Sequence, residues 1–365
     1  MPKGRIKTDY LIQTIEDYFK DKKYQFVLIL TDQNNSYGKN NYYKLKKHSF
    51  IQGYISQIVR IDSLKNSSNI IAKNILIQIN AKLNGTFNKI QFDKKILDLN
   101  LMIIGIDSFQ SKRQNIFSMV ATMDCNFSQF YNKGKFIYRE SHNNNHNIYP
   151  QDTNINKLSS SSSISSEKNK VVRYENFNII SNFIEEAIGE YYNKNKNFPG
   201  GIIIFRKEKV FKEKNKFIKR EIKEIELRLN GKISESILSK EKKIIPYYYI
   251  LINKKPKYQL NETEKNNIEN SGILIINEIT NKNYFEFYLH SGENLSLTFY
   301  RVLNGNMKCD EIIPKLTFDL CHNYPNWNGP IKIPNVMMAA EKLTKMVNTY
   351  KMDLNNKLKL GQSYL

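Results

Sequence analysis

The stretch from residue 101 to residue 110, LMIIGIDSFQ, constrains the fold of this chain more than any other. An apolar run this short predicts a buried strand, because a membrane helix needs roughly 18 or more apolar residues. The apolar part ends at Asp107, so the strand delivers one carboxylate to the end of a sheet. Ligand sites of α/β folds lie at such strand ends. We therefore expect Asp107 to mark a functional site.

The rest of the chain alternates between strand-like and helix-like patterns, which is typical of the α/β class. Strands are expected at 25–30, 116–124, 136–140, 202–205, 247–253, 273–277, 285–289 and 296–303. Helices are expected at 10–19, 72–83, 176–192, 217–229, 309–323 and from about 335 to 350. A polar stretch at about 141–170 includes five consecutive serines and predicts a disordered surface insertion.

Composition favours a polyanionic partner. Lysine and arginine outnumber aspartate and glutamate by 56 to 35, which gives a formal charge of +21. A genome rich in lysine and asparagine codons would produce the same excess without a function. Three cysteines without a CxxC pair indicate neither a disulfide framework nor a zinc ribbon. The sequence shows no signal-like N-terminus, so we expect an intracellular protein, cytoplasmic or nuclear, with no membrane partner.

Several motifs in order resemble the PIWI domain of the Argonaute/Piwi family. They are MIIGID, SMVATMD, GGIIIFRK, FEFYLHS, LTFDLCHNY, IKIP with an Ala-rich helix, and a C-terminal QSYL typical of Piwi-type members. The resemblance implies an RNase H-like PIWI domain over 93–365. It also implies a Rossmann-like MID domain over 1–92, truncated at its N-terminal side relative to the family.

In the MID domain, the resemblance implies a pocket for the 5′-phosphate of a guide strand. The matching residues are Tyr42, Lys46, Gln57 and Lys82. Tyr43 is an alternative to Tyr42, and Lys345 matches a basic residue that the family places nearby on the C-terminal helix. Ammonium, amide and hydroxyl donors satisfy phosphate oxygens, and an aromatic ring stacks on a base. The competing interpretation is that these are solvated surface lysines.

In the PIWI domain, the resemblance implies a degenerate nuclease site. Cleaving relatives hold two Mg²⁺ ions with acidic side chains, and Mg²⁺ requires oxygen ligands. Asp107 matches the first acid and is retained. Lys207 and Asn178 replace two further acids, and Glu341 stands at the fourth position. A lysine repels a divalent cation, so we expect no catalytic metal at this site.

Three hypotheses follow. In the first, the chain binds a small guide RNA through its 5′-phosphate and holds a guide–target duplex for RNA-guided silencing without cutting it. This needs no cofactor, although the resemblance leaves open a Mg²⁺ ion at the 5′-phosphate. The chain would act with a separate N-terminal half or, like short Argonautes, with an effector subunit. The second is a metal-dependent endonuclease that recruits Glu175 or Glu208. The third is a protein-interaction scaffold.

Overall fold

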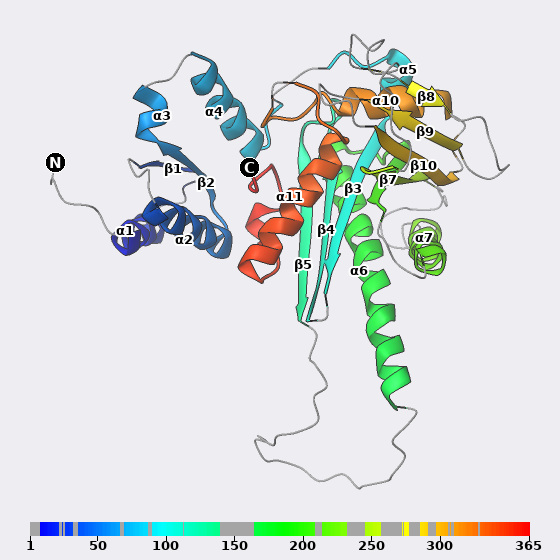
Figure 1. The fold of residues 1–365 in the computed structure, drawn as a ribbon, viewed down its shortest axis with the longest axis horizontal. Helices are drawn as coiled ribbons and strands as arrows, with labels where there is room; N and C mark the ends of the chain where they lie inside the picture. Colours follow the sequence, from blue (N-terminus) through cyan, green and yellow to red (C-terminus); the bar gives the residue numbers. More distant parts are fainter. Residues whose placement is uncertain are drawn as a thin grey trace, which may run out of the picture.

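The strand expected at 101–110 lies inside the larger of two sheets in the computed structural model (Figure 1). The structure describes residues 8–21, 24, 26–31, 36–65, 69–86, 90–111, 113–138, 164–208, 214–231, 245–256, 272, 274–276, 285–290, 297–305, 307, 310–327 and 329–365. Among the described helices, none is both long enough and apolar enough to cross a membrane.

The larger sheet has strand order β5-β4-β3-β6-β7-β10-β9-β8. Its strands are β3 (Leu101–Gln110), β4 (Gln114–Thr122), β5 (Phe130–Tyr138), β6 (Gly201–Lys207), β7 (Tyr247–Asn253), β8 (Leu274–Ile276), β9 (Phe285–Leu289) and β10 (Thr298–Gly305). Strands β3, β6 and β7 are adjacent and parallel. Their C-terminal ends therefore meet at one edge of the sheet, where Asp107 lies near the end of β3.

Helices cover both faces of this sheet. One face carries α6 (Ile164–Asn195) and α7 (Lys214–Gly231), and the other carries η1 (Asp310–Ile312), α10 (Ile313–Leu320) and α11 (Asn335–Tyr350). Strand geometry assigns alternate residues to the two faces. Ile103 packs in the core beneath α11, whereas Ile104 packs against α6 and α7. Asp107 follows the parity of Ile103 and so faces the side of α11.

Gly105 lets α11 lie directly on β3. A β-carbon at this position would stand 2.4 Å from the backbone oxygen of Val336 in the first turn of α11. Any larger residue would push the helix away from the strand. The glycine within IIGID therefore fixes how closely α11 approaches Asp107.

The smaller sheet pairs two parallel strands, β1 (Phe26–Thr31) and β2 (Ile55–Arg60). The helices around it are α1 (Thr8–Asp21), α2 (Ser36–Gln52), α3 (Ile61–Lys65) and α4 (Asn69–Lys82), and α5 (Lys94–Asp98) leads into the larger sheet. After η2 (Asn356–Leu358), the C-terminal tail runs between α4 and α11 (Figure 1). The backbone N–H of Gln362 donates to the carbonyl oxygen of Ala81 in α4 at 3.0 Å.

Two sequence predictions need correction. The last seven residues of the expected insertion, 164–170, belong to α6, while 141–163 lie outside the described residues. Strand β5 begins at Phe130 and not at residue 136. The first half of β5 contains the polar residue Asn132. That side chain is buried and donates to the carbonyl oxygen of Gly361, 229 positions away in the tail.

Candidate nucleic-acid interface

Two buried lysines converge in the smaller unit. Lys46 lies on α2 and Lys82 ends α4, and the two side chains are 7 % and 1 % exposed. Both ammonium groups donate to the carbonyl oxygen of Ser56 in β2, at 3.1 Å from Lys46 and 3.0 Å from Lys82. Lys82 also donates to Oε1 of Gln57 at 2.5 Å. Among the described residues, neither lysine forms an ion pair with an acid.

This arrangement disfavours the charged form of both lysines. Burial lowers the pKa of Lys46 to about 8. Burial, followed by the nearby charges of Lys46 and Lys342, lowers the pKa of Lys82 to about 6. No acid offsets the charged form of either lysine in the described structure, so an anion that enters would favour protonation of both. The pair therefore has the donors that an anion would need.

Tyr42 and Tyr43 differ in how they are held. Tyr43 donates its hydroxyl to the carbonyl oxygen of Thr349 at 3.3 Å, and its ring tilts against Tyr350 of α11. Tyr42 lies one helical turn before Lys46 on α2 and is 49 % exposed. Tyr43 is 37 % exposed, so Tyr42 has the more accessible ring of the two, which is what base stacking requires.

Helix α11 carries two lysines of interest. Lys342 lies near the lysine pair, and Lys345 lies at a second site, a cavity beside Asp107. Lys342 is the α11 residue whose charge helps to lower the pKa of Lys82. Lys345, which the resemblance places near the phosphate pocket, lines the cavity beside Asp107. Burial and then the charge of Lys345 lower the pKa of Lys342 to about 8, so the two lysines are electrostatic neighbours. One helix therefore joins the two candidate sites.

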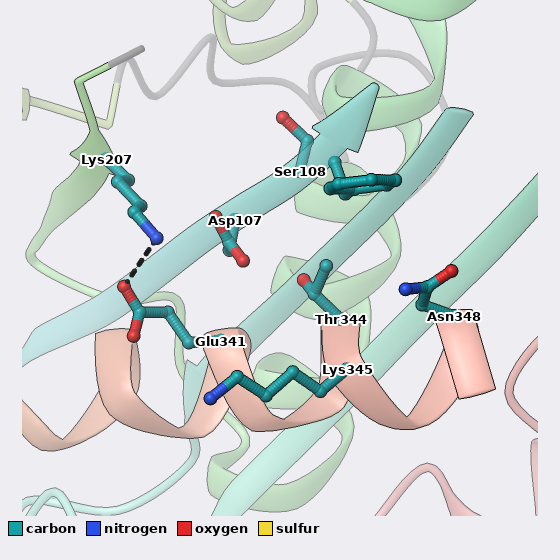
Figure 2. Close-up of a pocket in the computed structure, with 8 residues that line it drawn as sticks. Asp107, Ser108, Lys207, Glu341, Thr344, Lys345 and Asn348 are labelled. Carbon is teal, nitrogen blue, oxygen red and sulfur yellow. Dashed lines mark ion pairs between the residues drawn. The ribbon is translucent and has the colours of Figure 1, made fainter. Parts of the chain in front are cut away.

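The second site is a cavity of about 230 Å³ at the C-terminal end of β3 (Figure 2). Its lining residues are Asp107, Ser108, Phe109, Lys207, Glu341, Thr344, Lys345 and Asn348. Strands β3 and β6 pair in register up to Ile106 and Arg206, so Asp107 and Lys207 follow at neighbouring positions. Figure 2 shows Lys207 reaching from β6 towards Glu341 on α11, with Asp107 beside them.

Two lysines neutralise Glu341. Its Oε1 lies 2.9 Å from the Lys207 ammonium and its Oε2 lies 2.8 Å from that of Lys254, just after β7. Burial opposes the charge of Glu341, but Lys254 and Lys207 outweigh burial and lower its pKa. Burial likewise opposes the charge of Lys207, while Asp107 and Glu341 raise its pKa. Glu341 and Lys207 are therefore both charged at neutral pH.

A divalent metal does not fit this donor set. Mg²⁺ needs oxygen ligands, but an ammonium group lies within 2.9 Å of each Glu341 oxygen and would repel the ion. No group of three or more His, Cys, Asp or Glu side chains within the described part of the chain could hold a metal. Lys207 thus not only stands where the resemblance implies an acid but also pairs with Glu341, one of the two acids that line the cavity.

Asn178 does not reach this cavity. It lies exposed on α6, which packs against the opposite face of the sheet from α11. The expectation that it takes the place of an acid in the site is therefore not met in this structure. Of the two other acids considered, Glu208 follows β6 without lining the cavity, and the side chain of Glu175 lies outside the described residues.

A buried ion pair supports the strand ends from the α7 side. Arg206 is 3 % exposed and donates to both carboxylate oxygens of Glu221 on α7, at 3.0 and 3.2 Å. Tyr249 of β7 donates to the same carboxylate at 2.7 Å. Arg206 also donates to the carbonyl oxygen of Ile106 at 3.4 Å. This network ties β3, β6, β7 and α7 together next to Asp107.

Lys254 and Lys342 were missed in the sequence. Lys254 follows the predicted strand 247–253 directly, and parallel strands bring their C-terminal ends together, so reading the residue after each strand could have identified it. Lys342 is three residues before Lys345 on one helix. Which of the two faces the lysine pair depends on how α11 packs, and no local pattern reports that.

Known proteins resemble this chain over most of its length. The Piwi domain family matches residues 25–351. Protein argonaute-3 of Drosophila melanogaster is 25 % identical over 304 residues, covering 80 % of this chain and 29 % of that protein. Protein piwi of Drosophila melanogaster is 23 % identical over 357 residues, covering 94 % and 36 %. The chain thus spans about a third of the length of these curated relatives.

Solved structures share the fold. The crystal structure of Drosophila Piwi superposes with a TM-score of 0.75 at 22 % identity, covering 98 % of this chain and 44 % of the other. The Kluyveromyces polysporus Argonaute with a guide RNA gives 0.71 at 16 % identity, covering 97 % and 43 %. The mixed α/β sheet is accordingly that of an RNase H-like PIWI fold. Because the family match covers most of its residues, this chain belongs to the Argonaute/Piwi family.

Proposed function

We propose that this chain binds the 5′-phosphate of a small guide RNA at the buried lysine pair and holds a guide–target duplex without cutting it. One observation carries the proposal: the ammonium groups of Lys46 and Lys82 converge on one carbonyl oxygen with no acid paired to either of them in the described structure. A terminal phosphate carries nearly two negative charges and three acceptor oxygens. It is the group on an RNA strand that gains most from such a pair.

Neighbouring features support a nucleic acid as the ligand. The net charge of +21 favours binding to a polyanion, and Tyr42 offers an accessible ring beside Lys46. The Argonaute of Kluyveromyces polysporus, which shares this fold, was solved with a guide RNA. Affinity in this proposal comes mainly from backbone charge, and sequence recognition comes from base pairing with the guide.

The proposal excludes cleavage and a required metal. Lys207 and Lys254 neutralise Glu341 at the position where cleaving relatives hold metal ions, which leaves Asp107 as the remaining acid that lines the cavity. Binding of the guide should therefore persist in EDTA. A complementary RNA target should remain intact with Mg²⁺ or Mn²⁺.

The test is binding of one labelled single-stranded RNA with and without its 5′-phosphate across a salt series. Non-specific binding falls steeply with salt and barely responds to one extra phosphate among many. We expect a preference of about tenfold or more for the phosphorylated strand, roughly 1.4 kcal/mol, that persists at high salt. Equal affinities that decline together would refute the pocket. Metal-dependent cleavage that is lost in Asp107→Ala would favour the endonuclease instead.

A further inference from the structure

The cavity at Asp107 has the chemistry of an anion site. We propose that it binds a backbone phosphodiester of the nucleic acid held on the protein, through the ammonium groups of Lys207 and Lys345 and without a metal ion. This inference rests on the proposed function, because a nucleic acid must first be held on the protein. Cleaving relatives hold metal cations at this place in the fold. The inference assigns an anion, the phosphodiester, to the degenerate site of this chain.

The charges around the cavity favour an anion over a dication. Three lysines, Lys207, Lys254 and Lys345, face two acids, Asp107 and Glu341. Both oxygens of Glu341 are engaged by ammonium groups at 2.8 and 2.9 Å. A dication would have to displace both ammonium groups and would then meet them at short range. An incoming phosphodiester meets a net positive site.

Two of the lysines are free to contact a ligand. Lys207 is 39 % exposed and holds Glu341 with one ammonium, which has three donors. Among the described residues, the ammonium of Lys345 forms no ion pair, and its charge lowers the pKa of neighbouring Lys342. An unpaired lysine that lines a cavity beside a second lysine is a ready phosphate ligand.

The basic surface continues past the cavity. Burial, followed by the charges of Lys254 and Lys255, lowers the pKa of Lys332, so these three lysines are close neighbours. Glu341 fixes one end of this group through Lys254. The cavity volume of about 230 Å³ is several times the roughly 30 Å³ that one water molecule occupies, so a phosphodiester group fits.

Helix α11 also places the cavity within reach of a strand anchored at the lysine pair. Lys342 acts on Lys82 at one end, and Lys345, one turn further on, lines the cavity. The phosphodiester could come from the guide strand or from a paired target strand. The two sources share one chemistry, and the experiment separates them.

The experiment uses the full chain with Lys207→Gln, Lys345→Gln and the double variant, with Lys219→Gln as the control. Lys219 is an exposed lysine on α7, on the opposite face of the sheet, and its variant removes the same charge. For each protein we would measure the affinity for a 5′-phosphorylated single-stranded RNA. We would then measure the affinity of the loaded protein for a complementary RNA, in EDTA and in Mg²⁺.

We expect the double variant to weaken one of these steps about tenfold, equally in EDTA and Mg²⁺. Each lysine should lower the slope of log affinity against log salt by about one. A loss in the first step identifies a guide phosphate, and a loss confined to the second identifies a target phosphate. Lys345→Gln leaves both partners of Glu341 in place, so its effect cannot be assigned to a disrupted ion pair.

Two outcomes would overturn the inference: variants that bind like Lys219→Gln in both steps, or wild-type binding at these steps that requires Mg²⁺. The first outcome leaves the 5′-phosphate preference as the separate test of the proposed function, whereas a Mg²⁺ requirement for guide binding would also contradict the metal-free binding proposed there. A protein that ignores the 5′-phosphate but still depends on Lys207 and Lys345 would refute the lysine-pair proposal and retain this second site.

Discussion

The two lysine clusters of this protein differ in their counter-charges. Lys46 and Lys82 are buried side by side and share a carbonyl oxygen, with no acid paired to either in the described structure. Lys207 and Lys254 also converge on one group, but that group is the carboxylate of Glu341. The first cluster requires an external anion, whereas the second has neutralised the acid that a metal would use. The role of a buried lysine therefore depends on whether an acid of the protein already pairs with it.

The largest effect on stability should come from breaking the buried ion pair between Arg206 and Glu221. Glu221→Gln leaves the guanidinium of Arg206 buried without a charged partner. Removing one member of a buried pair costs about 3–5 kcal/mol. Urea unfolding should show that loss, with Lys315→Gln, which removes the exposed lysine of the Lys315–Asp319 pair, as a control that changes little. A loss as small as the control's would show that Arg206 is not held as described.

Lys82→Met should stabilise the protein, in contrast to Glu221→Gln. It removes a buried lysine whose charged form no acid offsets, and Lys46 still donates to the carbonyl oxygen of Ser56. We expect the RNA-free protein to gain about 2 kcal/mol at pH 7. The pKa of Lys82 is lowered to about 6 in the folded protein, whereas an unfolded lysine stays protonated up to its ordinary pKa. At pH 7 folding therefore costs the protein this proton, and Lys82→Met removes that cost.

The pH dependence of that gain tests its cause. Charge burial destabilises the wild-type protein most at low pH, and the penalty shrinks as pH rises from 6 towards 10.5. The gain from Lys82→Met should therefore be larger at pH 7 than at pH 9, measured by urea unfolding at both values. A destabilised variant, or a gain that grows with pH, would contradict the account of this pair.

Binding of the 5′-phosphate should strengthen as pH falls. The phosphate favours protonated lysine, and the pKa of Lys46 is lowered to about 8 without a ligand. Proton uptake by Lys46 alone predicts about tenfold tighter binding at pH 7 than at pH 9, and uptake by Lys82, whose pKa is lowered to about 6, makes the trend steeper. The phosphate keeps most of its second charge above about pH 6, so it does not reverse this trend. RNA without the phosphate serves as the reference, and parallel pH profiles for the two strands would contradict the linkage.

Tyr42→Ala should weaken RNA binding by the smallest amount, and the loss should not depend on the 5′-phosphate. Loss of one stacked base costs about 1 kcal/mol or somewhat more, equally with and without the 5′-phosphate. Tyr43→Phe is the matched control, because Tyr43 contacts α11 through its hydroxyl and ring. Fluorescence anisotropy with both RNAs would measure this. A selective loss for the phosphorylated strand would place Tyr42 at the phosphate and not at the base.

The sequence predicted regular, locally encoded features well. The bounds 101–110, 247–253 and 285–289 agree with β3, β7 and β9, because uninterrupted or alternating apolar runs specify buried strands. The residue types of the lysine pair were found through motif order. Their meeting at Ser56 was not predicted, since the contact joins α2, β2 and the end of α4.

Other features were not predicted because they too depend on contacts between distant parts of the chain. The first half of strand β5 contains Asn132, whose buried side chain donates to the carbonyl oxygen of Gly361 in the C-terminal tail. The roles of Lys342 and Lys345 depend on the rotation of α11, which Gly105 allows to lie close to β3. The pairing of Lys207 and Lys254 with Glu341 requires β6, β7 and α11 at once. Local patterns in a single sequence do not encode such three-part contacts.

The most direct test of the comparison is a thermodynamic cycle with the wild-type protein and the variant Lys46→Ala/Lys82→Met. Each protein is titrated at one high salt concentration with the same RNA, with and without its 5′-phosphate. The wild-type protein should prefer the phosphorylated strand by about tenfold or more, and the variant should lose that preference while binding the unphosphorylated strand nearly as well. Equal preferences in the two proteins would contradict the assignment of the phosphate to this pair.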